Sequence, residues 1–292
     1  MKPAQLAIIF AFLAVLCWAP NSAIGKLLVG ELDSYQIRFF TSLFSAITML
    51  LIILLQGKAN VLIEYKPKDW LNLSAIGFIG VFLAFLFFFE SLKRLPAQET
   101  MILFYFFPIP TALLGILFLR EKASLKGFLA MLISFFGAIV VITKGDVFSM
   151  QFTSVAGVLF GLAAALAHAF FSILDKKHEY EKFTANFVYF AVAAALSLLT
   201  VLAFSAIPSI SMPQLLGLLA IGAVVGGLGY TFFLLALKDG ETSAVSNIML
   251  LTPFVSLLFI SVLANEQILL SSIIGLAMIL AGIAFQSMGK SR

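Results

Sequence analysis

Long apolar runs follow one another along the chain and are separated by short polar breaks. Charged residues, prolines and glycines divide the chain into ten apolar segments, at 5–27, 34–56, 70–92, 98–119, 125–143, 154–174, 184–206, 213–237, 243–264 and 268–288. A membrane-spanning helix needs about 20 apolar residues, whereas the strands of a membrane barrel alternate polar and apolar positions over about ten residues. The pattern therefore predicts an all-α integral membrane protein with ten transmembrane helices.

Composition excludes several other classes of protein. Of the 292 residues, 62% are hydrophobic and 11% are charged, against about 45–50% and 25% in soluble domains. Ten spans leave no room for a soluble nucleotide-binding domain, and the sequence contains no P-loop, HExxH or GxSxG pattern. The single cysteine, Cys17, excludes an internal disulfide framework and a cysteine-based metal cluster. We therefore expect no cofactor and no bound metal.

The distribution of the 18 lysines and arginines predicts an orientation in the membrane. With the N-terminus in the cytoplasm, 13 of them fall on the cytoplasmic side and 5 on the outer side, as the positive-inside rule requires. We expect a multi-pass protein of the cytoplasmic membrane with both termini in the cytoplasm. The same rule explains the net charge of +4, so we expect the bilayer and a small-molecule substrate as partners, and no nucleic acid.

The two halves of the chain resemble each other at one fixed offset. Four pairs of identical residues lie 145 positions apart: Lys93 and Lys238, Pro108 and Pro253, Glu121 and Glu266, Gly137 and Gly282. This offset predicts two repeats, 1–145 and 146–292, of five spans each. Because five is an odd number, the two repeats must cross the membrane in opposite directions. Inverted repeats of this kind recur in transporters, with the substrate site near the midplane between them.

Polar side chains of the first span share one helical face. Trp18, Asn21 and Ser22 are spaced by three and four residues, and Pro20 predicts a bend among them. An unpaired amide in hydrocarbon costs roughly 4–8 kcal/mol, so we expect this face to turn toward other helices or water. It either lines a substrate cavity or forms interhelical hydrogen bonds, and the sequence leaves both open.

Two ionisable residues lie inside predicted spans. His168, in the sixth span, is a candidate for substrate binding or proton coupling because imidazole titrates near physiological pH; a structural histidine is the alternative. Glu90, near the outer end of the third span, is a second candidate for proton coupling. Its alternative is an intrahelical ion pair with Arg94, four residues further along the chain.

Prolines recur at corresponding places in the fourth and ninth spans. Pro108 and Pro253 are expected to bend their helices and to act as gating elements; the alternative is that prolines are simply common in membrane helices. Tyr105, Tyr230 and Asn247 are the nearby polar residues that can face a cavity. Most of the 32 phenylalanines are expected to face lipid.

Three segments of the chain resemble a known family. They are WAPNSAIGK at the end of the first span, YQIRFF in the second, and LREKASLKGFLAMLISFFGAIVVI at the close of the first half. These segments resemble the EamA-type members of the drug/metabolite transporter superfamily. The positions that match the family pattern are Trp18, Asn21, Ser22, Lys26, Arg38, Glu121 and Glu266. The resemblance implies a ten-helix secondary transporter, often an exporter of amino acids, nucleotide-related metabolites or toxic amphiphiles.

These observations together predict a secondary active transporter that exports a small metabolite, an amino acid or a related amphiphile, by alternating access. The expected substrate-binding residues are Trp18, Asn21, Ser22, Tyr105, His168, Tyr230 and Asn247. Ala163, 145 positions after Trp18, is expected to leave open volume opposite the indole ring. The alternatives are a membrane-embedded enzyme and a non-transporting sensor. An enzyme would need convergent acids, bases or metal ligands, and no spacing joins the available ones, so we expect no catalytic residues.

Overall fold

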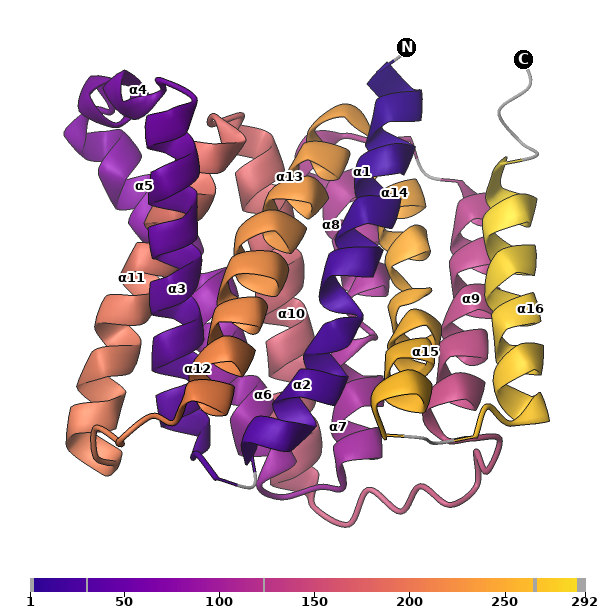
Figure 1. Ribbon diagram of the computed structural model, residues 1–292. Coiled ribbons are helices and arrows are strands. Elements are labelled where there is room, and N and C mark those ends of the chain that lie inside the picture. Colours follow the sequence, from indigo (N-terminus) through magenta and orange to yellow (C-terminus); the bar gives the residue numbers. More distant parts are fainter. Residues whose placement is uncertain (1–2, 30, 123, 265–266, 288–292) are drawn as a thin grey trace.

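The structure is a computed structural model that describes residues 3–29, 31–122, 124–264 and 267–287. Within these ranges, the side chains of Ser22 and Lys26 are not described. The described residues form a bundle of helices that run along a common direction (Figure 1), without any strand in these ranges.

Five spans make up the first half of the chain. They are α1 (Pro3–Trp18) with α2 (Pro20–Val29), α3 (Ser34–Leu55), α5 (Pro67–Gly77) with η1 (Phe78–Leu83) and α6 (Ala84–Leu92), α7 (Ala97–Phe104) with α8 (Pro108–Leu119), and α9 (Leu125–Ile142). A short helix, α4 (Ala59–Glu64), lies in the connection between α3 and α5. The third span thus consists of two α-helices, α5 and α6, with a π-helix between them.

The second half repeats this order. Its spans are α10 (Val155–His178), α11 (Lys182–Phe204), α12 (Met212–Leu219) with η2 (Ala220–Gly229) and α13 (Tyr230–Asp239), α14 (Thr242–Met249) with α15 (Thr252–Ala264), and α16 (Leu270–Ser287). Among the described residues, nine helical stretches are long and apolar enough to cross a membrane, and a tenth, Leu270–Gln286, is slightly shorter. The predicted fold class, ten transmembrane helices in two inverted five-helix repeats, is confirmed.

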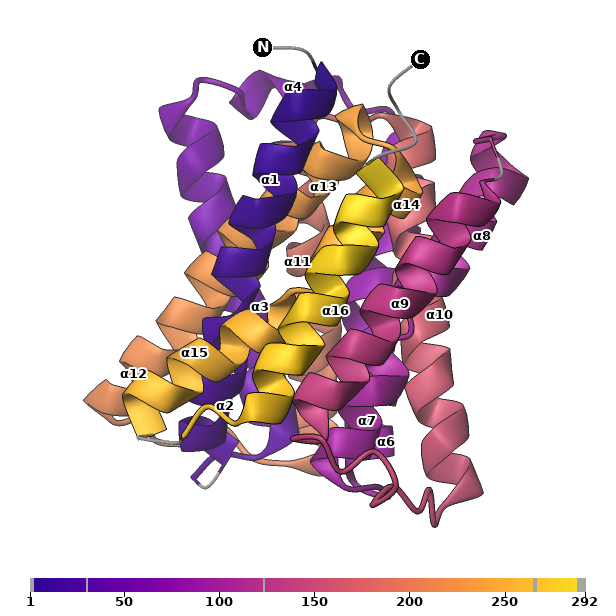
Figure 2. The ribbon, with the colours of Figure 1, turned by 90° about the vertical axis from the view of Figure 1, so that its right-hand side faces the viewer.

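The inversion is visible in the direction of the helices. α1 begins and α16 ends at the same end of the bundle, here called the terminal end (Figure 1), and α9 lies beside α16 (Figure 2). Ser134 Oγ of α9 donates to Ile279 O of α16, its own counterpart 145 positions away, at 3.2 Å. A Cβ on Gly137 would lie 2.6 Å from the backbone of α16, and one on Gly282 would lie 2.5 Å from that of α9. Equivalent residues therefore make equivalent contacts about a pseudo-two-fold axis.

Three spans are broken at proline. α1 ends at Trp18 and α2 begins at Pro20. In the fourth span, α8 begins at Pro108 after a turn, and in the ninth span, α15 begins one residue before Pro253. Proline lacks an N–H and clashes with the preceding turn, so it fits the first turn of a new helix. The bends expected at these three prolines are present.

The third and eighth spans contain π-helices, η1 and η2, at corresponding places of the two repeats. Hydrogen bonds in a π-helix run from residue i to i+5, and such segments are frequent at functional sites. Val81 O of η1 accepts a hydrogen bond from Arg38 Nη2. Gly226 O and Gly227 O of η2 accept hydrogen bonds from Asn186 Nδ2 at 3.2 and 2.9 Å. In each half, a side chain of the second span thus holds the π-helix of the third.

The offset of 145 positions does not extend through the first two spans of each half. The residues that cap the starts of α3 and α11, Asp33 and Glu181, lie 148 positions apart. The connection between α3 and α5, which contains α4, is longer than the one between α11 and α12 and absorbs the difference. The pairing of Trp18 with Ala163 assumes that the offset of 145 reaches the first span, and it stays a prediction.

Candidate functional site

His168, in α10, lies in the middle of an aromatic cluster that joins the two halves. The residue is buried, with 1% of its surface exposed. Six aromatic rings lie 4.7–6.1 Å from the imidazole, measured between ring centroids: those of Phe107, Phe104, Phe233, Phe171, Tyr230 and Trp18. They come from the first, fourth, sixth and eighth spans. We call His168 and these six rings the aromatic cage.

Three nitrogen atoms of the cage have no hydrogen-bond partner among the described residues. They are both ring nitrogens of His168 and Nε1 of Trp18, and all three are buried. A buried polar group without a partner costs about 1–3 kcal/mol. Because the rest of the cage is apolar except for the hydroxyl of Tyr230, these nitrogens are the atoms that can hydrogen-bond to a ligand.

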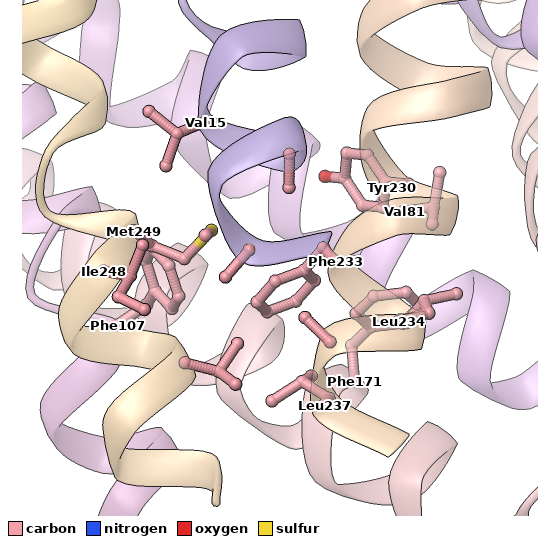
Figure 3. Close-up of a cluster of buried hydrophobic side chains, with 14 of the residues drawn as sticks. Val15, Val81, Phe107, Phe171, Tyr230, Phe233, Leu234, Leu237, Ile248 and Met249 are labelled. Atoms are coloured by element: carbon pink, nitrogen blue, oxygen red, sulfur yellow. The ribbon is translucent and has the colours of Figure 1, made fainter. Parts of the chain in front are cut away.

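The helix breaks help to bring the rings together. Trp18 is the last residue of α1, and Phe107 directly precedes α8, so each ring lies where its span bends. The ring of Trp18 lies 5.2 Å from those of both Tyr230 and Phe233. Figure 3 shows Phe107, Phe171, Tyr230 and Phe233 gathered in the space between their helices. The cage is therefore assembled from interrupted helices of the first half and from α10 and α13 of the second.

Three of the seven residues predicted to bind substrate meet in the cage: Trp18, His168 and Tyr230. Tyr105 lies beside it, with its ring 6.1 Å from that of Phe104. Asn21 is exposed, and the side chain of Ser22 lies outside the described ones.

Asn247, in α14, belongs to a different polar group. It is fully buried, and its Nδ2 donates to Gln286 Oε1 at 2.8 Å. Gln286 Nε2 in turn donates to Ser243 Oγ at 3.0 Å. The amide that was expected in the substrate site therefore joins the ninth span to the tenth.

The substrate-binding residues predicted from the sequence do not include the four phenylalanines of the cage, Phe104, Phe107, Phe171 and Phe233. Two of them follow a predicted site residue by three positions, Phe171 after His168 and Phe233 after Tyr230. Residues three apart share a helical face, so this spacing was the available signal. Phe107, Phe171 and Phe233 are fully buried and Phe104 is half-buried, so these four belong to the minority of phenylalanines that do not face lipid.

Glu90, near the end of α6, is held by two ion pairs. Its carboxylate lies 2.5 Å from Arg94 Nη1 and 2.7 Å from Lys93 Nζ, so the intrahelical pair with Arg94 is present. Lys93 also donates to the hydroxyl of Tyr35 at 3.0 Å. Hydrogen bonding to Glu90, and then to Tyr35, raises the pKa of Lys93 above its usual value. Lys93 therefore stays charged at physiological pH.

At the terminal end of the bundle, Glu121 connects the two halves. Its carboxylate lies 2.7 Å from Lys176 Nζ and accepts hydrogen bonds from Thr242 Oγ1 at 2.6 Å and Thr242 N–H at 3.2 Å. Lys176 also donates to Gly240 O at 2.6 Å. This network ties the turn after α8 to the end of α10 and the start of α14. Glu266, the counterpart of Glu121 in the sequence, lies outside the described residues.

Comparison with known proteins agrees with this architecture. Residues 5–143 and 155–288 each match the model of the EamA-like transporter family. The two matched segments cover the two repeats, and Trp18 of the first and His168 of the second meet in the cage, with their rings 6.1 Å apart.

Several relatives have similar length and organisation. The uncharacterized transporter YxxF of Bacillus subtilis is 26% identical over 76% of this chain and 72% of its own length. An uncharacterized transporter of Clostridium kluyveri is 23% identical over 94% and 90%, and the uncharacterized inner membrane transporter YhbE of Escherichia coli is 21% identical over 99% and 93%. A solved crystal structure, 19% identical, has a TM-score of 0.87 over 98% of both chains and so shares the fold. With the family model matched twice, across both repeats, the chain belongs to the EamA-like transporter family.

Proposed function

We propose that this protein is a secondary active transporter that exports a small metabolite, an amino acid or a related amphiphile, by alternating access. The observation that carries the proposal is the aromatic cage, a buried site built from both inverted halves that contains three unpaired nitrogens. Transporters with inverted repeats bind their substrate at such an interface, near the bilayer midplane.

The chemistry of the cage suits a small amphiphile. Six aromatic rings provide an apolar surface, while the nitrogens of His168 and Trp18 can hydrogen-bond to a polar group. Because these nitrogens have no partner among the described residues, a ligand that bonds to them removes the cost of leaving them unpaired. A substrate cation above the indole would add about 0.5–2 kcal/mol.

The broken helices support the alternating-access part of the proposal. The first and fourth spans, which contribute Trp18, Phe104 and Phe107, are interrupted next to these rings, whereas α10, which carries His168, is continuous. Movement of the bent segments against α10 would open the cage. The network of Glu121, Lys176 and Thr242 closes the terminal end, so it must break whenever the cage opens to that side.

The orientation follows from the charge distribution. We propose that the terminal end faces the cytoplasm, since 13 of the 18 lysines and arginines then lie on that side. Reporter fusions after Lys68, Lys122 and Lys177 should report the cytoplasm, and fusions after Arg94 and Asp146 should report the opposite side. A clear reversal at one of these sites would contradict the ten-span topology.

Replacing Pro108 or Pro253 with alanine should slow transport several-fold and leave membrane insertion and the unfolding temperature nearly unchanged. Alanine favours a continuous helix, so the span loses the bend that lets it act as a gate. The measurement is the rate of substrate counterflow in proteoliposomes. Pro96→Ala is the matched control, because Pro96 is exposed and lies before α7. If both variants transport at the native rate, the two bends are not gates.

Proton coupling is proposed to act through His168 and not through Glu90. Glu90 is neutralised by two cations outside the cage, whereas His168 lies where the substrate is proposed to bind. In the closed cage no water reaches the imidazole, so proton exchange would take place in an open state.

A thermal-shift screen followed by a flux assay tests the proposed function. Purified protein is screened against amino acids, nucleosides, polyamines, quaternary amines and vitamins, since a ligand of the native state stabilises it by about 2.7 kcal/mol at a hundredfold excess over its Kd. Each compound that binds is then tested for counterflow in proteoliposomes. Binding without flux for every compound would favour the sensor alternative over a transporter.

A further inference from the structure

Arg38, in α3, carries a guanidinium among aromatic side chains inside the membrane-spanning part of the bundle. Its Cζ lies 4.0 Å from the ring centroid of Phe85 and 5.9 Å from that of Phe190. Nη2 donates to Val81 O of η1, and this is its one hydrogen bond among the described residues. Nε is buried and has no partner. The guanidinium is therefore held in place with part of its donor capacity unused.

No carboxylate pairs with Arg38 in the described part of the chain. The nearest acidic residue along its pocket, Glu90, is engaged by Lys93 and Arg94 at 2.7 and 2.5 Å. Charged side chains inside a membrane protein are costly and are normally paired, so an unpaired one is by default a functional residue. Contact with two aromatic rings offsets only part of that cost.

Arg38 lines a small pocket between α3, the third span and α11, together with Tyr35 and Ser34 on its own helix. One wall is apolar and consists of Phe82, Leu86 and Phe89. The opposite wall is polar and includes Ser197 and Thr200 of α11. Ser197 is fully buried, and its hydroxyl has no hydrogen-bond partner. The pocket thus contains two unsatisfied polar groups, the Arg38 guanidinium and the Ser197 hydroxyl.

The pocket is connected to the aromatic cage through one side chain. Phe190, which lies beside Arg38, has its ring 5.2 Å from that of Tyr230 in the cage. The pocket volume of about 20 Å³ holds no more than one water. The pocket therefore has room for a single water beside Arg38, and a larger ligand needs the surrounding helices to move apart.

We infer that Arg38 binds the carboxylate of an anionic substrate, whose apolar part lies against the wall formed by Phe82, Leu86 and Phe89. This inference rests on the proposed transport function and narrows its substrate class to organic acids with an apolar group, amino acids included. A guanidinium donates two parallel hydrogen bonds to a carboxylate, and Ser197 adds a neutral donor. A phosphate dianion is less suited, because Arg38 is the one cation among the described residues that line the pocket.

The first test uses pairs of probes that differ only in charge. Hexanoate with hexanamide, and phenylacetate with phenylacetamide, are compared by thermal shift on the purified full-length protein. The carboxylate of each pair should bind roughly 10–100-fold more tightly than the amide, the range expected for a hydrogen bond to a charged group. Equal binding of acids and amides would overturn the inference without any mutation. Inorganic phosphate is included, and tighter binding of phosphate would also overturn it.

The second test changes the pocket. Arg38→Gln should weaken binding of the carboxylates roughly 10–100-fold, so that acids and amides bind the variant equally well. Arg38→Lys should retain part of the higher affinity for carboxylates. Ser197→Ala removes an unpaired hydroxyl, so it should weaken carboxylate binding without loss of folding. Lys177→Gln, which removes an exposed cation at the terminal end of α10, is the matched control.

The outcomes separate this inference from the proposed function. Counterflow of neutral or cationic solutes, with neither binding nor flux of any carboxylate, would leave the transporter intact and overturn the anion site. Native carboxylate binding in Arg38→Gln would do the same. Absence of flux for every solute, anionic or not, would instead contradict the transport function on which the inference rests.

Discussion

Replacing Lys182 with methionine should lower the free energy of unfolding by about 3–5 kcal/mol. Lys182 Nζ lies 2.6 Å from Asp175 Oδ2, and the two side chains are only 1% and 0% exposed. Tyr189 donates its hydroxyl to the other carboxylate oxygen at 2.9 Å. Removal of the lysine leaves the Asp175 carboxylate buried without a counter-charge. The resulting loss of stability is larger than the net stabilisation that the intact ion pair contributes. The measurement is the unfolding transition of the purified protein in a single detergent.

Lys58→Met is the matched control for this prediction, because it removes the same group from an exposed ion pair. Lys58 lies 2.7 Å from Glu181, with side chains 38% and 27% exposed, and such a pair contributes about 0–1 kcal/mol. The double variant Asp175→Asn with Lys182→Met removes both charges and should recover much of the lost stability. If Lys58→Met and Lys182→Met lower the free energy of unfolding equally, burial of the ion pair does not determine its effect on stability.

The spans and the repeat could be predicted from the sequence because they depend on the character of whole segments. A run of about 20 apolar residues has few alternatives to a membrane helix, and the prolines at 20, 108 and 253 end helices for local reasons. The inversion needs only the odd number of spans in each half. All of these predictions concern the backbone, and they hold.

Side-chain directions were harder to predict, for a physical reason. In a helix that is apolar on all sides, periodicity does not distinguish the face that packs from the face that meets lipid. The four phenylalanines of the cage therefore escaped prediction. Lys182 belongs, in the sequence, to the charged segment between the sixth and seventh spans, yet its side chain is buried at the start of α11 and paired with Asp175. Neither position can be assigned before the neighbouring helix is known.

The pairing of the halves shows a second limit. A gapless offset of 145 relates Pro108 to Pro253, but the connection that contains α4 shifts the earlier spans by three or more positions. One fixed offset therefore cannot pair the first span with the sixth. Trp18 and His168, which the sequence singles out separately, meet in the cage with their rings 6.1 Å apart.

The unpaired nitrogens of Trp18 and His168 lower the stability of the folded protein. Six aromatic rings surround an imidazole whose two nitrogens have no partner among the described residues. An apolar ring at position 168 would therefore make the folded protein more stable than histidine does. Natural sequences depart from such local consistency chiefly at functional sites. Stability and transport should therefore respond in opposite directions to the same substitution at position 168.

His168→Phe should raise the unfolding temperature of the ligand-free protein and reduce transport at least roughly 10-fold. Removal of two unpaired buried nitrogens recovers about 1–3 kcal/mol, and loss of one hydrogen bond to substrate costs about a factor of ten or more. His168→Leu, with a volume close to that of histidine, controls for overpacking. The measurements are thermal unfolding without ligand and counterflow in proteoliposomes.

A pH series on His168→Gln extends the same test. Imidazole that charges in an open state near pH 6–7 attracts an anionic substrate and repels a cationic one. Binding of phenylacetate should therefore strengthen from roughly pH 8 to 5.5 in the native protein and stay constant in the variant. If His168→Phe instead lowers stability and leaves transport unchanged, the imidazole has a structural role, and the substrate site lies elsewhere. Normal binding in Trp18→Ala would remove the cage from the mechanism altogether, because that substitution deletes one of its walls.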